Sequence, residues 1–164
     1  MANTMAFKVF LTYSLDPSEA ALAWRLQTLA AAYGVEMYVP RRGGSASQQK
    51  AFANEAIKEI DRSDCVLAII TGKTEQAVEI ELSHALARKK PVVPIVRSDL
   101  AGQPLLAQFP SLFTFSPTDD PGSLESQVFE FLRQQQLTKE MQQAMGALVA
   151  IGLGLLLLYS VSEK

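Results

Sequence analysis

The stretch of sequence that decides the fold is residues 65–71 (CVLAIIT), together with the helical segment 75–88 and the run PVVPIV at 91–96. The first run is apolar on both faces, which is typical of a strand buried inside a parallel sheet. A buried strand, a helix and a second apolar strand in this order predict a parallel sheet covered by helices. These residues therefore indicate an α/β fold.

The same alternation continues on both sides of this unit. The further strands predicted are 8–13, 35–39 and 112–115, and the further helices are 16–33, 48–62 and 122–136. Residues 1–136 are thus predicted to form one α/β domain, a flavodoxin-like parallel sheet of about five strands flanked by helices. Because ligands of such folds bind at the carboxyl ends of the strands, we expect any site at that edge.

Composition narrows the possible functions. The chain has 164 residues and a net charge of −2, and no run of basic residues exceeds the triplet 88–90, so we expect no nucleic-acid partner. Cys65 is the only cysteine, which excludes an intrachain disulfide and a cysteine-rich metal site, and we expect it to be buried. A single histidine, His84, argues against a multi-histidine metal site, so no metal is expected. Residues 1–7 show no signal-peptide pattern.

The C-terminal part of the chain differs from the rest. Residues 144–161 (AMGALVAIGLGLLLLYSV) are eighteen residues without a charge. As a helix they would span about 27 Å, close to the roughly 30 Å core of a bilayer. We therefore predict a single-pass transmembrane helix at 144–161, with a polar helical spacer at 137–143, a short tail at 162–164 and the N-terminal domain in the cytoplasm.

Small residues follow one face of this predicted membrane helix. Gly146, Ala150 and Gly154 are spaced four residues apart, so they lie on one side of a helix. Such spacing lets two helices approach closely in lipid, and it predicts self-association as a homo-oligomer.

A candidate catalytic carboxylate lies in the helix predicted at 75–88. The residues three and four positions from Glu81 are small or apolar, except for His84, whereas those around Glu79 are mostly polar. Glu81 is therefore predicted to project from the packed side of its helix. A carboxylate there is ion-paired, protonated or used in chemistry, and a structural ion pair remains an open alternative.

Three segments of the chain resemble the Toll/interleukin-1 receptor (TIR) domain family. Residues 9–14 (VFLTYS), followed by Asp16, resemble the first TIR box, and residues 63–71 (SDCVLAIIT) resemble a later TIR strand. Glu81, followed by Lys90-Pro91, resembles the TIR helix with its glutamate and the strand after it. The resemblance covers roughly residues 7–136 and implies a TIR-like fold.

Bacterial and plant TIR domains of this kind cleave NAD at the nicotinamide–ribose bond. The resemblance implies that activity here, with Glu81 as the catalytic residue, NAD as substrate rather than cofactor, and a role in bacterial antiphage defence or signalling. The loop 40–47 (PRRGGSAS) corresponds to the family's substrate-gating and self-association loop. Arg41 and Arg42 would hold the pyrophosphate, because a guanidinium group suits phosphate oxygens, and Gly43 would give the loop flexibility.

The other residues expected to contact the substrate lie at the strand ends or beside Glu81: Thr12, Tyr13, Ser14, Thr71 and His84.

The chain also departs from the family. Where TIR enzymes often carry a serine and an aromatic residue before the glutamate, it has Glu75 and Ala77. This departure favours a non-enzymatic TIR-type interaction module at a membrane. Nucleoside 2-deoxyribosyltransferases share a similar glutamate helix and Lys-Pro strand, so an N-glycosidase acting on nucleosides is a third hypothesis. The aromatic residues of the first helix, Trp24 and Tyr33, are expected in the core.

Overall fold

The computed structural model describes residues 7–14, 16–72, 75–100, 102, 109, 112–116 and 120–150. It contains a five-stranded sheet in the order β2-β1-β3-β4-β5, in which all neighbouring strands are parallel. The strands are β1 (Phe7–Thr12), β2 (Val35–Tyr38), β3 (Cys65–Ile70), β4 (Val92–Arg97) and β5 (Phe113–Phe115). The order and direction confirm the predicted flavodoxin-like sheet.

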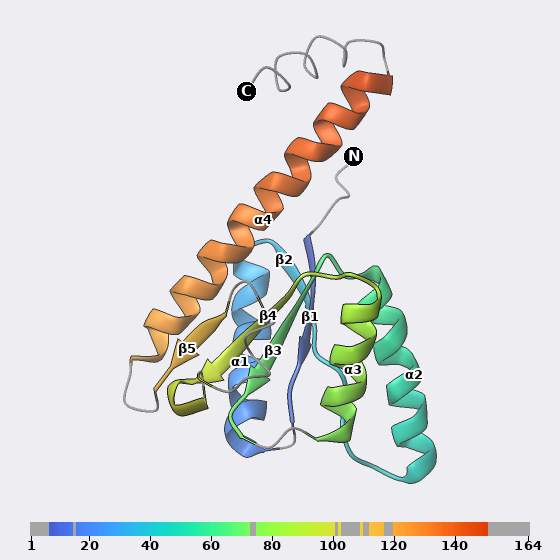
Figure 1. The fold of residues 1–164 in the computed structure, drawn as a ribbon, viewed down its shortest axis with the longest axis vertical. Helices are drawn as coiled ribbons and strands as arrows, with labels where there is room; N and C mark the ends of the chain where they lie inside the picture. Colours follow the sequence, from blue (N-terminus) through green and yellow to red (C-terminus); the bar gives the residue numbers. More distant parts are fainter. Residues whose placement is uncertain are drawn as a thin grey trace.

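Helices cover both faces of the sheet (Figure 1). On one face lie α1 (Pro17–Ala32) and α4 (Pro121–Ala150), and on the other lie α2 (Ala46–Arg62) and α3 (Gln76–Ala87). A short 3-10 helix, η1 (Ser98–Leu100), follows β4.

The central strand β3 is buried along its whole length, as its two-sided apolar pattern predicts. Its residues pair with β1 on one side and with β4 on the other; Leu67, for example, lies opposite Leu11 and Val93. Cys65 opens this strand and is 1% exposed. Burial raises the pKa of its thiol to about 12, so it is protonated and unreactive at neutral pH.

Local signals fix where the helices begin and end. Asp16 caps α1 by accepting a hydrogen bond from the Ser18 amide, and Gly34 follows the helix with a φ of 73°. Ser45 and Gln48 form a capping box at the start of α2, each side chain bonding the other residue's backbone amide. The capping box thus sets the end of the loop that joins β2 to α2.

The helix α4 is longer than predicted, because one continuous helix runs from Pro121 to Ala150 through the predicted spacer 137–143. No proline or glycine interrupts residues 123–145, so nothing in the sequence ends the helix near residue 136. Figure 1 shows α4 passing the amino ends of the strands and projecting beyond the sheet. Lys139 contacts Asp64 at the start of β3, with 2.7 Å between Nζ and Oδ2.

The predicted membrane segment 144–161 lies only partly in α4, since residues 151–164, including Gly154, are outside the described residues. Within the part of the chain that the structure describes, no helix has both the length and the apolar character needed to cross a membrane.

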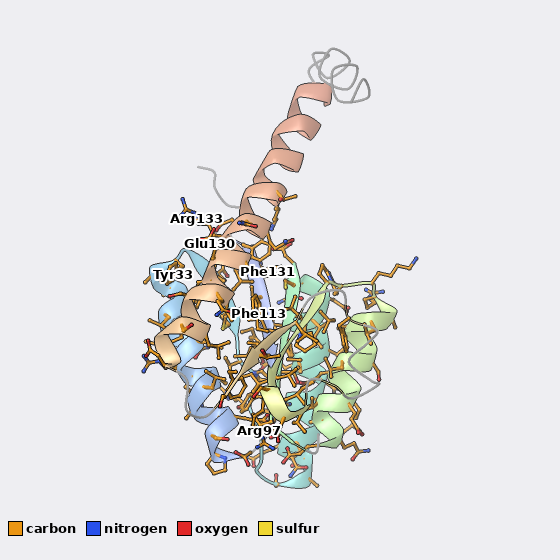
Figure 2. The ribbon with its side chains drawn as sticks, turned by 60° about the vertical axis from the view of Figure 1, so that its left-hand side comes forward. Tyr33, Arg97, Phe113, Glu130, Phe131 and Arg133 are labelled. Carbon is orange, nitrogen blue, oxygen red and sulfur yellow. The ribbon has the colours of Figure 1, made fainter. Side chains whose placement is uncertain are left out.

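The expectation that Trp24 and Tyr33 lie in the core is wrong, since each is 52% exposed. Trp24 lies on α1 outside its buried face, which is formed by Glu19, Ala23, Leu26 and Ala30, and Tyr33 is the residue that follows the helix. Tyr33 stacks on Phe129 of α4 with ring centroids 4.5 Å apart, and Phe113 of β5 meets Phe131 edge-on (Figure 2). Aromatic contacts thus hold α4 against the sheet and α1.

Candidate functional site

Glu81 lies in the second turn of α3 and is 3% exposed, in agreement with its helical spacing. Its side chain reaches the end of β1, where the Thr12 hydroxyl donates a hydrogen bond of 2.6 Å to Oε1. Strand β1 lies beside β3, at the point where the order of the sheet reverses. In flavodoxin-like folds this is the position at which ligands bind.

Arg42, from the loop between β2 and α2, forms a two-pronged ion pair with Glu81. Nη1 lies 2.6 Å from Oε2 and Nη2 lies 2.7 Å from Oε1. The two side chains are only 7% and 4% exposed. Fork-shaped arginine–carboxylate pairs of this kind combine strong hydrogen bonds with a fixed geometry. Both oxygens of Glu81 are therefore occupied in this arrangement.

Tyr13 contacts Arg42 through both its backbone carbonyl and its aromatic ring. Its backbone carbonyl accepts hydrogen bonds from Nε and Nη2 of Arg42, at 3.0 and 2.8 Å. Its ring lies beneath the guanidinium, 5.1 Å away, and its hydroxyl donates to the Pro40 carbonyl at 2.9 Å. Burial raises the pKa of Tyr13, although the charge of Arg42 opposes this, so the hydroxyl remains a donor.

Two glycines direct the loop so that Arg42 turns inward. Gly43 and Gly44 have φ values of 82° and 88°, in the region that side chains other than glycine disfavour. A Cβ at Gly44 would also lie 2.4 Å from Oε1 of Gln48, the oxygen that accepts the capping-box hydrogen bond. The loop conformation therefore depends on both glycines.

A cavity of about 410 Å³ opens beside Glu81, between the loop and the first turns of α2 and α3. Its size falls within the range of small-molecule sites. Its apolar lining residues are Phe52, Ala53, Ile57, Ala77 and Ile80, and its charged lining residues are Arg41, Arg42, Lys50, Glu75 and Glu81. A pocket that combines an apolar wall with several cations suits a ring-bearing anion.

A second buried carboxylate, Glu19 of α1, joins the ends of β1 and β3. It is 3% exposed and accepts hydrogen bonds from the Ser14 amide at 2.8 Å and from the Thr71 amide at 3.1 Å. The Thr71 hydroxyl also donates to it. Glu19 thereby fixes the two strand ends that flank the site.

The structure unites some of the predicted site residues and separates others. Thr12, Arg42 and Glu81 are directly hydrogen-bonded, and Arg41 and Gly43 line the cavity with them. Ser14 and Thr71 bond Glu19 rather than lining the cavity.

His84 is not brought to the cavity. Its Nε2 lies 2.8 Å from Oδ1 of Asp61, at the end of α2 farther from the site. The two side chains tie α2 to α3, together with Arg88, which bonds the same carboxylate oxygen at 2.9 Å.

Sequence reasoning missed Glu19 and Phe52, and the chain carries a local signal only for Glu19. Glu19 shares a helical face with the buried Ala23, Leu26 and Ala30, a spacing that indicates burial. Phe52 shares a helical face with the buried Ala56 and Ile60, a spacing that predicts packing, but it lines the cavity. Among the described residues, no group of three or more histidine, cysteine or acidic side chains gathers in a way that could hold a metal ion.

Comparison with known proteins shows a similarity of fold only. No protein-family model matches the chain, and no curated protein matches it in sequence. Its structure is similar to that in the RPS4 and RRS1 TIR domain heterodimer, with a TM-score of 0.56, 10% identity and coverage of 80% of this chain and 98% of the other.

Two further solved structures are similar. The CMP N-glycosidase BcmB of Clostridium botulinum matches with a TM-score of 0.50 and 17% identity, over 79% of this chain and 98% of the other. The Vibrio vulnificus NanR protein, complexed with ManNAc-6P, matches with a TM-score of 0.51 and 14% identity, over 89% of this chain and 57% of NanR. The α/β fold is thus shared with a TIR domain and with an N-glycosidase.

Proposed function

We propose that this chain cleaves the N-glycosidic bond of a nucleotide, with NAD as the favoured substrate and Glu81 as the catalytic residue. The observation that carries the proposal is a buried carboxylate in the wall of a cavity of about 410 Å³ at the ligand-binding edge of the sheet. The resemblance to TIR domains supports NAD, and cations in the cavity lining suit its phosphates.

One carboxylate is sufficient for this chemistry. In NAD the ring nitrogen carries a positive charge, so when its bond to ribose C1′ breaks, both bonding electrons leave with nicotinamide, which departs as a neutral molecule. No acid is needed to protonate the leaving group. The ribose becomes cationic in the transition state, and an adjacent carboxylate stabilises or traps it. Attack by water gives ADP-ribose, and attack by a hydroxyl or ring nitrogen of the substrate gives a cyclic isomer.

The ion pair with Arg42 implies a preceding step. A carboxylate whose two oxygens both accept hydrogen bonds is a poor nucleophile, so Arg42 must leave Glu81 before reaction. Movement of the glycine-containing loop would free Glu81 and would bring the Arg42 guanidinium toward the phosphates. Loop movement would thus couple substrate binding to exposure of the carboxylate.

The proposal extends to the membrane. The uncharged segment 144–161 supports a single-pass anchor whose side chains contact membrane lipid. The N-terminal domain would then lie in the cytoplasm. Close packing at Gly146, Ala150 and Gly154 would join copies into a homo-oligomer and raise the activity, which fits a role in antiphage defence or signalling.

Two other functions remain to be tested. The buried Arg42–Glu81 pair and Ala77 in the cavity favour a non-enzymatic interaction module, in which Glu81 is structural. The second alternative is an N-glycosidase that acts on CMP or on deoxynucleosides, and the fold shared with a CMP N-glycosidase supports it.

The test is chromatography of products after the full chain, reconstituted in lipid, is incubated separately with NAD, CMP and deoxyadenosine. The proposal predicts nicotinamide from NAD, and its loss in a Glu81→Gln variant. Release of cytosine or adenine without release of nicotinamide would favour the N-glycosidase hypothesis. If none of the three is cleaved while the chain self-associates, the interaction module is correct.

A further inference from the structure

We propose that Phe52 of α2 is the platform on which the aromatic ring of a nucleotide stacks in the cavity. This inference rests on the proposed function for the class of ligand, and it names a specificity-determining residue on the helix that faces Glu81. The juxtaposition of Phe52, Arg41 and Ile80 in one cavity carries it.

The first step is that α3 offers no aromatic side chain to the cavity. Its lining residues there are Glu75, Gln76, Ala77, Ile80 and Glu81, and the small Ala77 leaves space one turn before Glu81. Phe52 is the aromatic residue that lines the cavity, and it comes from α2 on the opposite side. Helices α2 and α3 both begin at the carboxyl edge of the sheet (Figure 1). Phe52 and Glu81 each lie in the second turn of their helix, and both line the cavity.

The second step concerns the direction in which the ring faces. The Arg41 guanidinium lies over the Phe52 ring, 5.9 Å from its centroid, and both residues line the cavity. A face of the ring is therefore turned toward the loop and the opening. That separation is too short for a second ring to enter between them, so a bound ring would displace Arg41. A cation–π contact at an exposed site is weak, which makes this displacement easy.

The third step is that a nucleotide gives Arg41 a better partner. Neither Arg41 nor Lys50 forms an ion pair with any residue that the structure describes, although both line the cavity. A ribose phosphate attached to the stacked ring would supply the anion for these cations. Ile80, which is 48% exposed at the cavity, would be covered by the same ligand.

The ligand is thus a planar heterocycle joined to a phosphorylated ribose. Either half of a dinucleotide has this chemistry, so the test uses both halves. Calorimetric titration of the full chain in detergent with AMP, with nicotinamide mononucleotide and with the ring-free ribose 5-phosphate measures the contribution of the ring.

The Phe52→Leu variant is expected to lose about tenfold or more in affinity for at least one of the two nucleotides, the size typical of a lost stacking contact, with no change for ribose 5-phosphate. Phe52→Trp keeps an aromatic ring and should retain the affinity of the unaltered chain. The control is Trp24→Leu, which removes an exposed aromatic residue on the opposite face of the sheet and should leave the affinity unchanged. Nucleotide binding that Phe52→Leu does not weaken, or absence of nucleotide binding by the unaltered chain, overturns the inference. If binding depends on Phe52 but no bond is cleaved, the stacking site stands and the catalytic proposal fails.

Discussion

At the scale of single residues, the site is held by one buried ion pair. Removing a charge from water is costly, and the Arg42–Glu81 pair recovers that cost through two short hydrogen bonds, with a third to Glu81 from Thr12. Each member of the pair therefore compensates the buried charge of the other, while Arg42 occupies the carboxylate that the chemistry needs. Functional sites often contain such competing requirements.

Replacing Arg42 by alanine tests the energetic role of this pair. It leaves Glu81 buried without a cation, although water in the adjacent cavity can solvate it in part, so we expect the free energy of unfolding to fall by about 1–3 kcal/mol. Urea denaturation measures the change. Arg41→Ala, which removes an exposed arginine one position earlier, is the matched control and should change stability by less than about 0.5 kcal/mol. Equal losses of unfolding free energy in the two variants would contradict a specific contribution of the Arg42–Glu81 ion pair to stability.

At the scale of elements, the end of α3 contains a strained residue. Lys89 adopts a φ of 58°, in the left-handed region that favours glycine, just after the helix ends. The chain tolerates it because the following Lys90 donates its amide to the Ala85 carbonyl and places its ammonium on the carbonyls of Asp61 and Ser63.

Lys89→Gly should therefore stabilise the protein by about 0.5–1 kcal/mol, since it removes the steric penalty of the left-handed conformation. Thermal or urea unfolding measures this. Lys89→Ala keeps the Cβ and the strain, and should leave stability almost unchanged. A glycine variant no more stable than the alanine variant would contradict the explanation.

The contact between α2 and α3 should depend on pH through Asp61. A hydrogen bond from His84, followed by one from Arg88, lowers the pKa of Asp61 below its ordinary value of 3.8. Because the folded-state pKa is the lower one, this stabilisation is complete above about pH 3.8 and is lost as the pH falls below it. Asp61→Asn should therefore reduce stability at neutral pH, and the difference from the unaltered chain should shrink as the pH falls below 3.8. Urea midpoints measured across this range check it, and a difference independent of pH would be the opposite result.

The sequence predicts the secondary structure better than it predicts the contacts of the candidate site. The strands and helices follow from local apolar patterns, and the burial of Glu81 follows from the neighbours on its helix. Its partner was not predictable, because Arg42 reaches Glu81 only through the positive φ values of Gly43 and Gly44 and through the carbonyl of Tyr13. Phe52 belongs to the cavity because of where α2 begins relative to the edge of the sheet, and that depends on tertiary packing rather than on local pattern.

At the scale of the whole molecule, the candidate site and the projecting end of α4 lie at opposite ends of the sheet. Arg97, at the end of β4, lies on the carboxyl edge, while α4 extends past the amino edge beyond Arg133 (Figure 2). The proposed membrane segment 144–161 begins within the projecting end of α4, so an anchor there would hold the domain with its cavity directed away from the lipid. Soluble nucleotides would then reach the site without obstruction.

The measurement that tests the central claim most directly is the initial rate of nicotinamide release from NAD by the full chain in lipid. We expect Glu81→Gln to lower this rate at least about 100-fold, since it removes the charge that stabilises the ribosyl cation. Glu79→Gln, an exposed neighbour on the same helix, should stay within about twofold of the unaltered chain. Circular dichroism shows whether each variant is folded. A folded Glu81→Gln variant that releases nicotinamide at the unaltered rate would contradict the assignment of Glu81.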